Sequence, residues 1–286
     1  MDQRIINLYD EYTHKPLSRD DFLKKLAILS GSMALALSIA PLLESNKARA
    51  ATIAVDDDEL DTEMISYDGD DDTTIFAYTA KMKKKSNMGG VLVIHENRGL
   101  NDHIKDVTRR LAKAGFMAMA PDALSDSGGT PYDEDEARKL ITNLDPKKNL
   151  ANFIKSVAFL KARKEVNRHV GCVGFCWGGG LANQLAVNVP SLEVAVAFYG
   201  KQPEAVDVPK IKAAVQLHYA GLDERINAGI PVYEEALKKA GTKYELYIYE
   251  GVNHAFHNDT SEARYNADAA LHAWKRTLDF LEANLK

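Results

Sequence analysis

The segment VGCVGFCWGGG, residues 170–180, decides the fold. Its first half is an apolar run with the length of a buried strand, and its glycine-rich end predicts the start of a helix. Between them, Gly174-Phe175-Cys176-Trp177-Gly178 has the spacing of a nucleophile elbow with cysteine in place of serine. Such a turn holds the side chain clear of the sheet, and the helix dipole beneath it favours thiolate. We therefore expect Cys176 to be a nucleophile rather than a buried structural cysteine.

Outward from this segment, apolar runs of strand length alternate with amphipathic runs of helix length. Strands are expected over 75–79, 91–94, 116–120, 170–174, 194–199, 213–219 and 244–249. Helices are expected over 102–114, 149–164, 179–189, 232–240 and 267–285. This order predicts an α/β fold with a mostly parallel central sheet and helices on both faces. The polar stretch after Pro121, with Gly128, Gly129 and Pro131, is expected to be a loop over the site.

Composition narrows the class of protein. The chain has 286 residues, of which 45% are hydrophobic and 27% charged, as is usual for a globular protein. Its formal charge of -5 gives little attraction to phosphate, so no nucleic-acid partner is expected. Its two cysteines, Cys172 and Cys176, exclude a disulfide-stapled scaffold and a four-cysteine zinc site. Cys172 lies inside the strand and is expected to be buried, although a redox pair with Cys176 stays open as an alternative.

An acid and a base follow the nucleophile in the chain order of elbow hydrolases. Asp223 comes shortly after the strand that ends at Tyr219, and His254 comes after the strand that ends near Tyr249. The imidazole would accept the thiol proton, while the carboxylate would fix the tautomer of the ring. His257 is a competing base, and a metal bound by His254, His257 and Asp223 is a further alternative.

The first fifty residues differ from the rest. A polar stretch ends at Lys24 and Lys25, an uncharged run covers 26–43, and Ala48-Arg49-Ala50 has the small-x-small form of a signal-peptidase site. SRDDFLK, residues 18–24, resembles the twin-arginine export motif, but Asp20 stands in place of the second arginine.

These features divide the chain into a signal-like segment, residues 1–50, and one domain, residues 51–286. The segment predicts a periplasmic or exported protein if it is cleaved, and a cytoplasmic one otherwise. An uncleaved helical tail and a membrane anchor are the alternatives to cleavage. No integral membrane span is expected in the mature chain.

Several motifs together resemble the dienelactone hydrolase family, the carboxymethylenebutenolidase-like enzymes of α/β-hydrolase fold. The resemblance covers about residues 60–286. With its N-terminal segment, the whole chain is most similar to a bacterial group of the family that has an N-terminal signal-like segment. Its motifs are VIHENRGLNDHIKDVTRRLAKAGFMAMAPD, GFCWGG, YAGLDERI, GVNHAFHN and AWKRTLDFL.

The resemblance implies a role for each matching residue. Cys176 would be the nucleophile, His254 the base and Asp223 its orienting acid. Glu96 matches a glutamate that contacts the resting thiol and helps to ionise it. The backbone N–H groups of Asn97 and Trp177 would form the oxyanion hole. No metal and no organic cofactor is expected.

The chain departs from the family where a substrate carboxylate is bound. Asn258 stands where the family has an arginine, and the loop after Pro121 holds no second one; Arg138 lies further along. Arg98 is a candidate anion-binding residue, and Tyr132 is a candidate for lining the pocket. Tyr199 and Trp177 are expected to give that pocket apolar walls.

We therefore expect a hydrolase of lactones or small carboxylic esters that works through a thioester acyl-enzyme, with a small-molecule ester or lactone as its partner. A general carboxylesterase or thioesterase without lactone preference is the alternative enzyme. A thiol-based binding or redox-sensing protein is the alternative outside enzymes.

Overall fold

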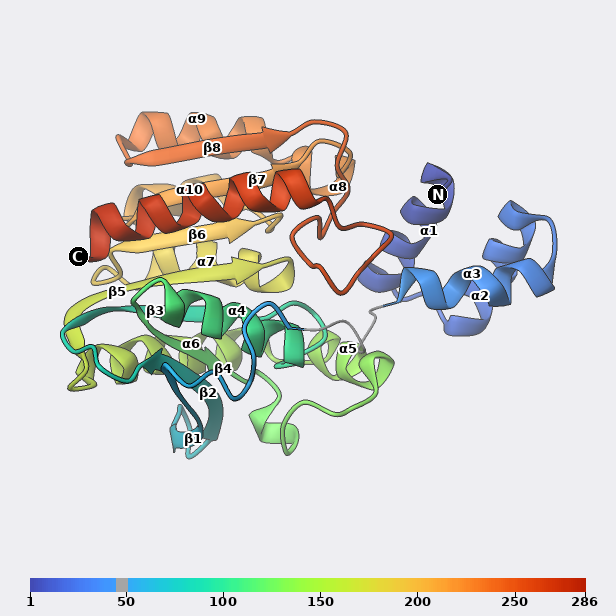
Figure 1. The fold of residues 1–286 in the computed structure, drawn as a ribbon. Helices are drawn as coiled ribbons and strands as arrows, with labels where there is room; N and C mark the ends of the chain where they lie inside the picture. Colours follow the sequence, from blue (N-terminus) through green and yellow to red (C-terminus); the bar gives the residue numbers. More distant parts are fainter. Residues whose placement is uncertain (45–50) are drawn as a thin grey trace.

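The computed structural model describes residues 1–44 and 51–286, in which an eight-stranded sheet lies between two layers of helices (Figure 1). The strand order is β1-β2-β4-β3-β5-β6-β7-β8. The strands are β1 (Leu60–Asp68), β2 (Thr74–Met82), β3 (Met88–Ile94), β4 (Met117–Pro121), β5 (Val166–Phe175), β6 (Val194–Phe198), β7 (Ala214–Ala220) and β8 (Tyr244–Tyr249). Along this order, each pair of neighbours from β4 through β3 to β8 is parallel. The pairs β1 with β2 and β2 with β4 are antiparallel. The expected α/β fold with a mostly parallel sheet is confirmed.

Helices cover both faces of the sheet. They are α4 (Asp102–Lys113), α5 (Glu134–Thr142), α6 (Pro146–Ala162), α7 (Trp177–Asn188), α8 (Glu224–Asn227), α9 (Ile230–Ala240) and α10 (Ala267–Leu285). Because successive strand residues point to opposite faces, each strand contributes to two cores. Leu92 and Ile94 of β3 pack in the core that contains residues of α6, α7 and α9, whereas Val91 and Val93 pack in the core that contains residues of α4 and α10.

Several helices begin at polar residues whose side chains cap the first turn. The Oδ1 atom of Asn101 accepts a hydrogen bond from the Ile104 amide at the start of α4, and Asn266 caps α10 in the same way. Asp145 caps α6, whose first residue is Pro146, a position where proline loses no helical hydrogen bond. These caps satisfy amide groups at the helix starts that have no acceptor within the helix.

Strand β1 and helix α5 are among the elements that the sequence analysis does not predict. Strand β1 forms the edge of the sheet, and only Leu60 and Tyr67 along it are buried, so its hydrophobic pattern is weak. Helix α5 occupies part of the stretch expected to be a loop. Asp133 caps it, and Ala137 and Ile141 bury its inner face, which shortens that loop.

The N-terminal residues form three helices, α1 (Gln3–His14), α2 (Arg19–Ser30) and α3 (Met33–Leu43). They have a small apolar core of their own, which includes Tyr9, Phe22, Leu26 and Leu43. Figure 1 shows them beyond the carboxyl ends of the strands, with α1 nearest to the sheet. The N-terminal segment therefore packs beside the edge where parallel sheets carry their active sites.

Among residues 1–44 and 51–286, none of the helices taken singly is long and apolar enough to cross a membrane. Helices α2 and α3 meet the same criteria only as a pair, with a bend of 112° between them. The expected cleavage motif Ala48-Arg49-Ala50 lies outside the described residues.

Candidate active site

Cys176 occupies a sharp turn between the end of β5 and the start of α7. Its backbone has φ 56° and ψ -113°, a conformation that residues with a side chain rarely adopt. A Cβ atom at Gly174 would overlap the carbonyl oxygen of Gly178, and one at Gly178 would overlap the carbonyl oxygens of Ile94 and His95. The glycines on either side therefore allow the close approach that the turn requires.

Asp223 and His254 lie in the loops that follow β7 and β8. The Nδ1 atom of His254 donates a hydrogen bond to Oδ2 of Asp223 at 2.5 Å, and both side chains are buried. Burial acts to raise the pKa of Asp223, but the adjacent His254 holds that pKa below its ordinary value. Since Nδ1 is the donor, the lone pair of the ring is on Nε2.

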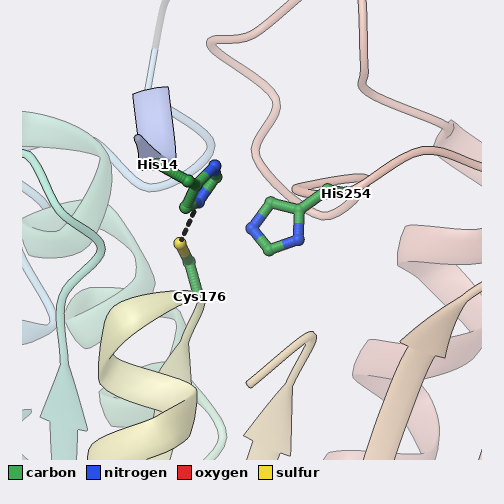
Figure 2. Close-up of side chains that lie close together, drawn as sticks. All are labelled: His14, Cys176 and His254. Carbon is green, nitrogen blue, oxygen red and sulfur yellow. Dashed lines mark hydrogen bonds between the residues drawn. The ribbon is translucent and has the colours of Figure 1, made fainter. Parts of the chain in front are cut away.

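The ring of His254 faces the thiol of Cys176, and a second imidazole lies beside it (Figure 2). The Nε2 atom of His14, at the end of α1, forms a hydrogen bond with Sγ of Cys176 at 3.2 Å. The two imidazole centroids are 4.7 Å apart with an interplanar angle of 79°. One ligand atom from each of the three side chains lies within 4.8 Å of the other two.

The orientation of the His14 ring is set by Asp10, one helical turn earlier. Nδ1 of His14 donates to the carbonyl oxygen of Asp10 at 2.9 Å and lies 3.1 Å from its carboxylate oxygen Oδ1. Burial acts to lower the pKa of His14, but Cys176 and Asp10 together raise it above its ordinary value. In the neutral ring with Nδ1 as the donor, Nε2 of His14 also directs its lone pair at the thiol.

Contacts from helix α5 and from the loop after β3 hold α1 over the site. The Tyr12 hydroxyl donates to Oδ2 of Asp135 at 2.8 Å, and the guanidinium carbon of Arg138 lies 4.0 Å from the centre of the Tyr12 ring. The side-chain amide of Asn97 donates to the carbonyl oxygen of Thr13 at 2.8 Å. Arg138 therefore binds the N-terminal helix.

Neither Asp10 nor His14 is predicted from the sequence as a site residue, because residues 1–25 are interpreted there as a polar stretch. A signal is present in that stretch. Ile5, Leu8 and Tyr12 recur at helical spacing and are buried in the structure. This pattern is typical of an amphipathic helix that docks on a protein surface.

Glu96 lies at the end of β3 and is buried, but its hydrogen bonds differ from those implied by the family resemblance. Its Oε2 atom accepts from Nδ2 of Asn258 at 2.6 Å, and Oε1 accepts from the Tyr199 hydroxyl at 3.3 Å. Among the described residues, no hydrogen bond joins Glu96 to the thiol of Cys176, whose sulfur contacts His14 instead. Asn258 thus binds Glu96 as a neutral partner.

Of the two residues whose amides are expected to form an oxyanion hole, Trp177 directly follows Cys176 and Asn97 lines the same cavity as Cys176. Trp177 is the first residue of α7, so its N–H has no acceptor within the helix. Asn97 follows β3, and the neighbouring His95 ring stacks on the Trp177 ring at 5.2 Å with an interplanar angle of 10°. The stacking holds the loop of Asn97 against the start of α7.

Cys176 opens into a cavity of about 680 Å³ at the carboxyl ends of the strands. Trp177 and Tyr199 contribute to its lining, as the sequence predicts, together with His14 and His254. Apolar side chains from α5, α6 and α7 line another part of the wall: Ile141, Leu150 and Leu181. Three cations also border the cavity: Lys147, Lys201 and Arg225.

Arg98 and Tyr132 line a different cavity, of about 190 Å³, whose lining does not include Cys176. The Arg98 guanidinium is buried, and it donates to the Tyr9 hydroxyl at 3.2 Å and to Oε2 of Glu134 at 3.3 Å. The structure therefore does not bring these two expected substrate-binding residues to the thiol.

The other two candidate residues, His257 and Cys172, are buried in the packed interior of the domain. His257 is fully buried and lies 5.1 Å from the Phe175 ring, and burial followed by the His103 charge lowers its pKa well below the ordinary value. Asp223 pairs with His254 rather than with His257. Cys172 is buried and unpaired by any disulfide, and burial raises the pKa of its thiol.

Residues 75–285 match the model of the dienelactone hydrolase family. The chain is 37% identical over 229 residues to the "Putative carboxymethylenebutenolidase" of Saccharolobus solfataricus, with 67% of this chain and 88% of the relative covered. A protein of the same name from Methylorubrum extorquens is 30% identical over 290 residues, with 93% and 95% covered. This second match extends into residues 1–50, because fewer than fifty residues of the chain lie outside it.

The fold is also similar to solved structures. That of "Putative Dienelactone Hydrolase" from Klebsiella pneumoniae superposes with a TM-score of 0.71 at 27% identity and covers 78% of this chain and 98% of that one. An acylaminoacyl peptidase of Pyrococcus horikoshii, at 13% identity and a TM-score of 0.62, shares the fold alone.

Proposed function

Since the chain belongs to the dienelactone hydrolase family and is a carboxylic ester hydrolase, we propose that it cleaves lactones or small carboxylic esters with Cys176, His254 and Asp223. The observation that carries the proposal is the arrangement at the elbow. The strained turn presents the thiol to a cavity, and the buried His254 ring, bonded to Asp223, directs Nε2 toward it. A nucleophile, a base that faces it and an acid that orients the base are the components of covalent acyl transfer.

The first half of the reaction makes a thioester. His254 Nε2 takes the thiol proton while Sγ attacks the carbonyl carbon of the ester. The carbonyl oxygen becomes an oxyanion, which accepts hydrogen bonds from the amides of Trp177 and Asn97. As the tetrahedral species collapses, the alkoxide leaves with the proton from His254. In a lactone, this alkoxide stays attached to the acyl chain as a hydroxyl group.

The second half releases the acid. His254 removes a proton from water, the resulting hydroxide attacks the thioester carbonyl, and the Cys176 thiolate leaves and regains its proton. Asp223 keeps the ring oriented and stabilises the imidazolium in both halves. The cavity volume is within the range of small-molecule sites, which supports a compact substrate.

The test is hydrolysis of p-nitrophenyl acetate and of a lactone panel. Wild type is expected to show a burst of p-nitrophenol, and acid quenching during the burst is expected to leave one acetyl group on the peptide that contains Cys176. Cys176→Ala is expected to lose both signals. His254→Asn is expected to lower kcat about a thousandfold, because a positioned base contributes about that much.

His272→Asn is the matched control, since His272 is an exposed histidine on α10. It is expected to keep the wild-type rate. Acetylation at another residue, or retention of most of the activity by Cys176→Ala, would contradict the thioester mechanism.

A further inference from the structure

Three metal-ligating side chains meet beside the cavity from three distant parts of the chain. His14 comes from α1, Cys176 from the turn after β5, and His254 from the loop after β8 (Figure 2). Their ligand atoms lie within 4.8 Å of one another. A thiolate with two imidazoles is a donor set that suits Zn²⁺.

Both imidazoles are held in the orientation of metal ligands. Histidines that bind metals usually donate their other ring N–H to a carboxylate or a backbone carbonyl. Here Nδ1 of His254 donates to Asp223, and Nδ1 of His14 donates to the carbonyl of Asp10 and lies beside its carboxylate. Each Nε2 is therefore left with a lone pair directed toward Sγ of Cys176.

One of these nitrogen atoms is buried without a partner. His254 is 4% exposed, and its Nε2 has no hydrogen-bond partner among the described residues. A buried polar atom without a partner costs free energy, so the site is incomplete as a hydrogen-bonded cluster. A cation between His254, His14 and Cys176 would satisfy this atom.

We propose that His14, Cys176 and His254 bind a zinc ion and that the bound ion fastens helix α1 over the thiol of Cys176. Zinc–sulfur and zinc–nitrogen bonds of about 2.3 and 2.0 Å set tetrahedral ligand atoms about 3.5 Å apart. His14 Nε2 and Sγ are already 3.2 Å apart. Since all three atoms lie within 4.8 Å, side-chain shifts on the order of 1 Å complete the site.

The surrounding charges fit a divalent cation. A thiolate leaves one positive charge of Zn²⁺ uncompensated, and the carboxylates of Asp10 and Asp223 lie directly behind the two imidazoles. Arg225 in turn pairs with Asp10 at 3.4 Å. The cluster with its metal is thus close to neutral, which lowers the cost of holding the ion in a largely buried place.

The site cannot bind zinc and hydrolyse esters at the same time, an inference that rests on the proposed function. As zinc binds, the thiol proton leaves to solvent and the sulfur lone pair enters the metal bond. Sγ is then unable to attack a carbonyl, and Nε2 of His254 is unable to accept a proton. Zinc would also fasten α1 to the domain, since His14 supplies one of the three ligands.

The test titrates Zn²⁺ into the full chain, stripped of metal, against a chromophoric chelator. Wild type is expected to bind one ion, and Co²⁺ in its place is expected to give a thiolate-to-cobalt charge-transfer band that Cys176→Ala abolishes. His14→Gln is expected to lower zinc affinity about 100-fold. Asp10→Asn, which removes a positioning carboxylate, is expected to lower it about tenfold, because such outer partners contribute 10–100-fold.

His169→Gln is the matched control. His169 is a surface histidine that contacts Glu193, so it reports adventitious binding, and its loss is expected to leave the affinity unchanged. Equal zinc affinities of wild type and His14→Gln would overturn the inference. Ester hydrolysis by the metal-free protein separates the two proposals. Absence of hydrolysis before zinc is added, followed by His14-dependent zinc uptake, contradicts only the proposed function. Hydrolysis by the metal-free protein together with His14-independent zinc binding contradicts only this inference.

Discussion

The backbone of Cys176 combines a positive φ with a residue that has a Cβ atom. A conformation of this kind costs about 1–3 kcal/mol, which the surrounding structure has to supply. The hydrogen bond from the Cys176 amide to the Phe198 carbonyl, at 3.0 Å, helps to hold it. The thiol is thus presented to the cavity at the expense of stability.

Replacing the residue by glycine should return part of that free energy. We expect Cys176→Gly to unfold with a free energy about 1 kcal/mol higher than Cys176→Ala, because both lose the thiol but only glycine accepts the backbone conformation without strain. Urea denaturation of the two variants measures the difference. If the alanine variant is the more stable of the two, the turn carries no strain.

At the level of single residues, the sequence predicts the meeting of Cys176, Asp223 and His254, because parallel strands end at one edge and each residue follows a strand end. The partners of Glu96 and the cavity of Arg98 are set by loop conformations, which have no periodic pattern in the sequence. The contact of His14 with the thiol joins residues 162 positions apart and follows from docking of a helix, which no local motif specifies.

The glycines of α7 differ in how closely they approach their neighbours. A Cβ atom at Gly178 would overlap the carbonyl oxygens of Ile94 and His95, which are backbone atoms at the end of β3. A Cβ atom at Gly180 would meet its nearest neighbour at 3.5 Å, an ordinary contact. The helix therefore requires glycine at the first position and not at the second.

Two alanine substitutions should separate these cases. Gly178→Ala is expected to lower the free energy of unfolding by about 3 kcal/mol, because strand β3 and helix α7 have to move apart. Gly180→Ala is expected to raise it by about 0.5 kcal/mol through helix propensity. Thermal and urea unfolding of both variants measures the difference, and equal effects would show that the approach of α7 to β3 tolerates a methyl group.

The regular elements are largely predictable, since strong apolar periodicity marks the core strands and α10, whose expected range of 267–285 matches the structure. Strand β1 escapes prediction because its middle is exposed and its pairing with β2 supplies most of its order. Helix α5 escapes prediction because it is short and mostly polar, with Ala137, Leu140 and Ile141 as its apolar residues.

Across the whole molecule, a cluster of charges joins the loop that carries His254 to helix α4. Asp259 accepts hydrogen bonds from Nδ1 of His103 at 3.0 Å and from Nη2 of Arg110 at 2.5 Å. Burial acts to raise the pKa of Asp259, but His103 and Arg110 hold that pKa well below its ordinary value. The ionised carboxylate therefore stabilises the folded state.

A carboxyl whose pKa is lowered by folding contributes stability above its unfolded pKa of about 3.9, and this stability is lost as the pH falls further. We expect Asp259→Asn to lower the free energy of unfolding by about 2 kcal/mol at pH 7 and by progressively less below about pH 4. Urea denaturation across this range measures it.

The control for this experiment is Asp279→Asn, which removes an exposed partner of Lys275 on α10. Surface pairs of this kind contribute under about 1 kcal/mol. A loss of stability in Asp259→Asn that does not change with pH would mean that the charge of Asp259 is irrelevant to folding.

Helices α1, α2 and α3 enclose apolar side chains that an unfolded chain would expose. Phe22, Leu26 and Leu43 are fully buried once the three helices have packed together. A partner that recognises an extended apolar stretch would therefore reach these side chains only if the helices separate first, so binding of such a partner and packing of the helices would compete for the same residues.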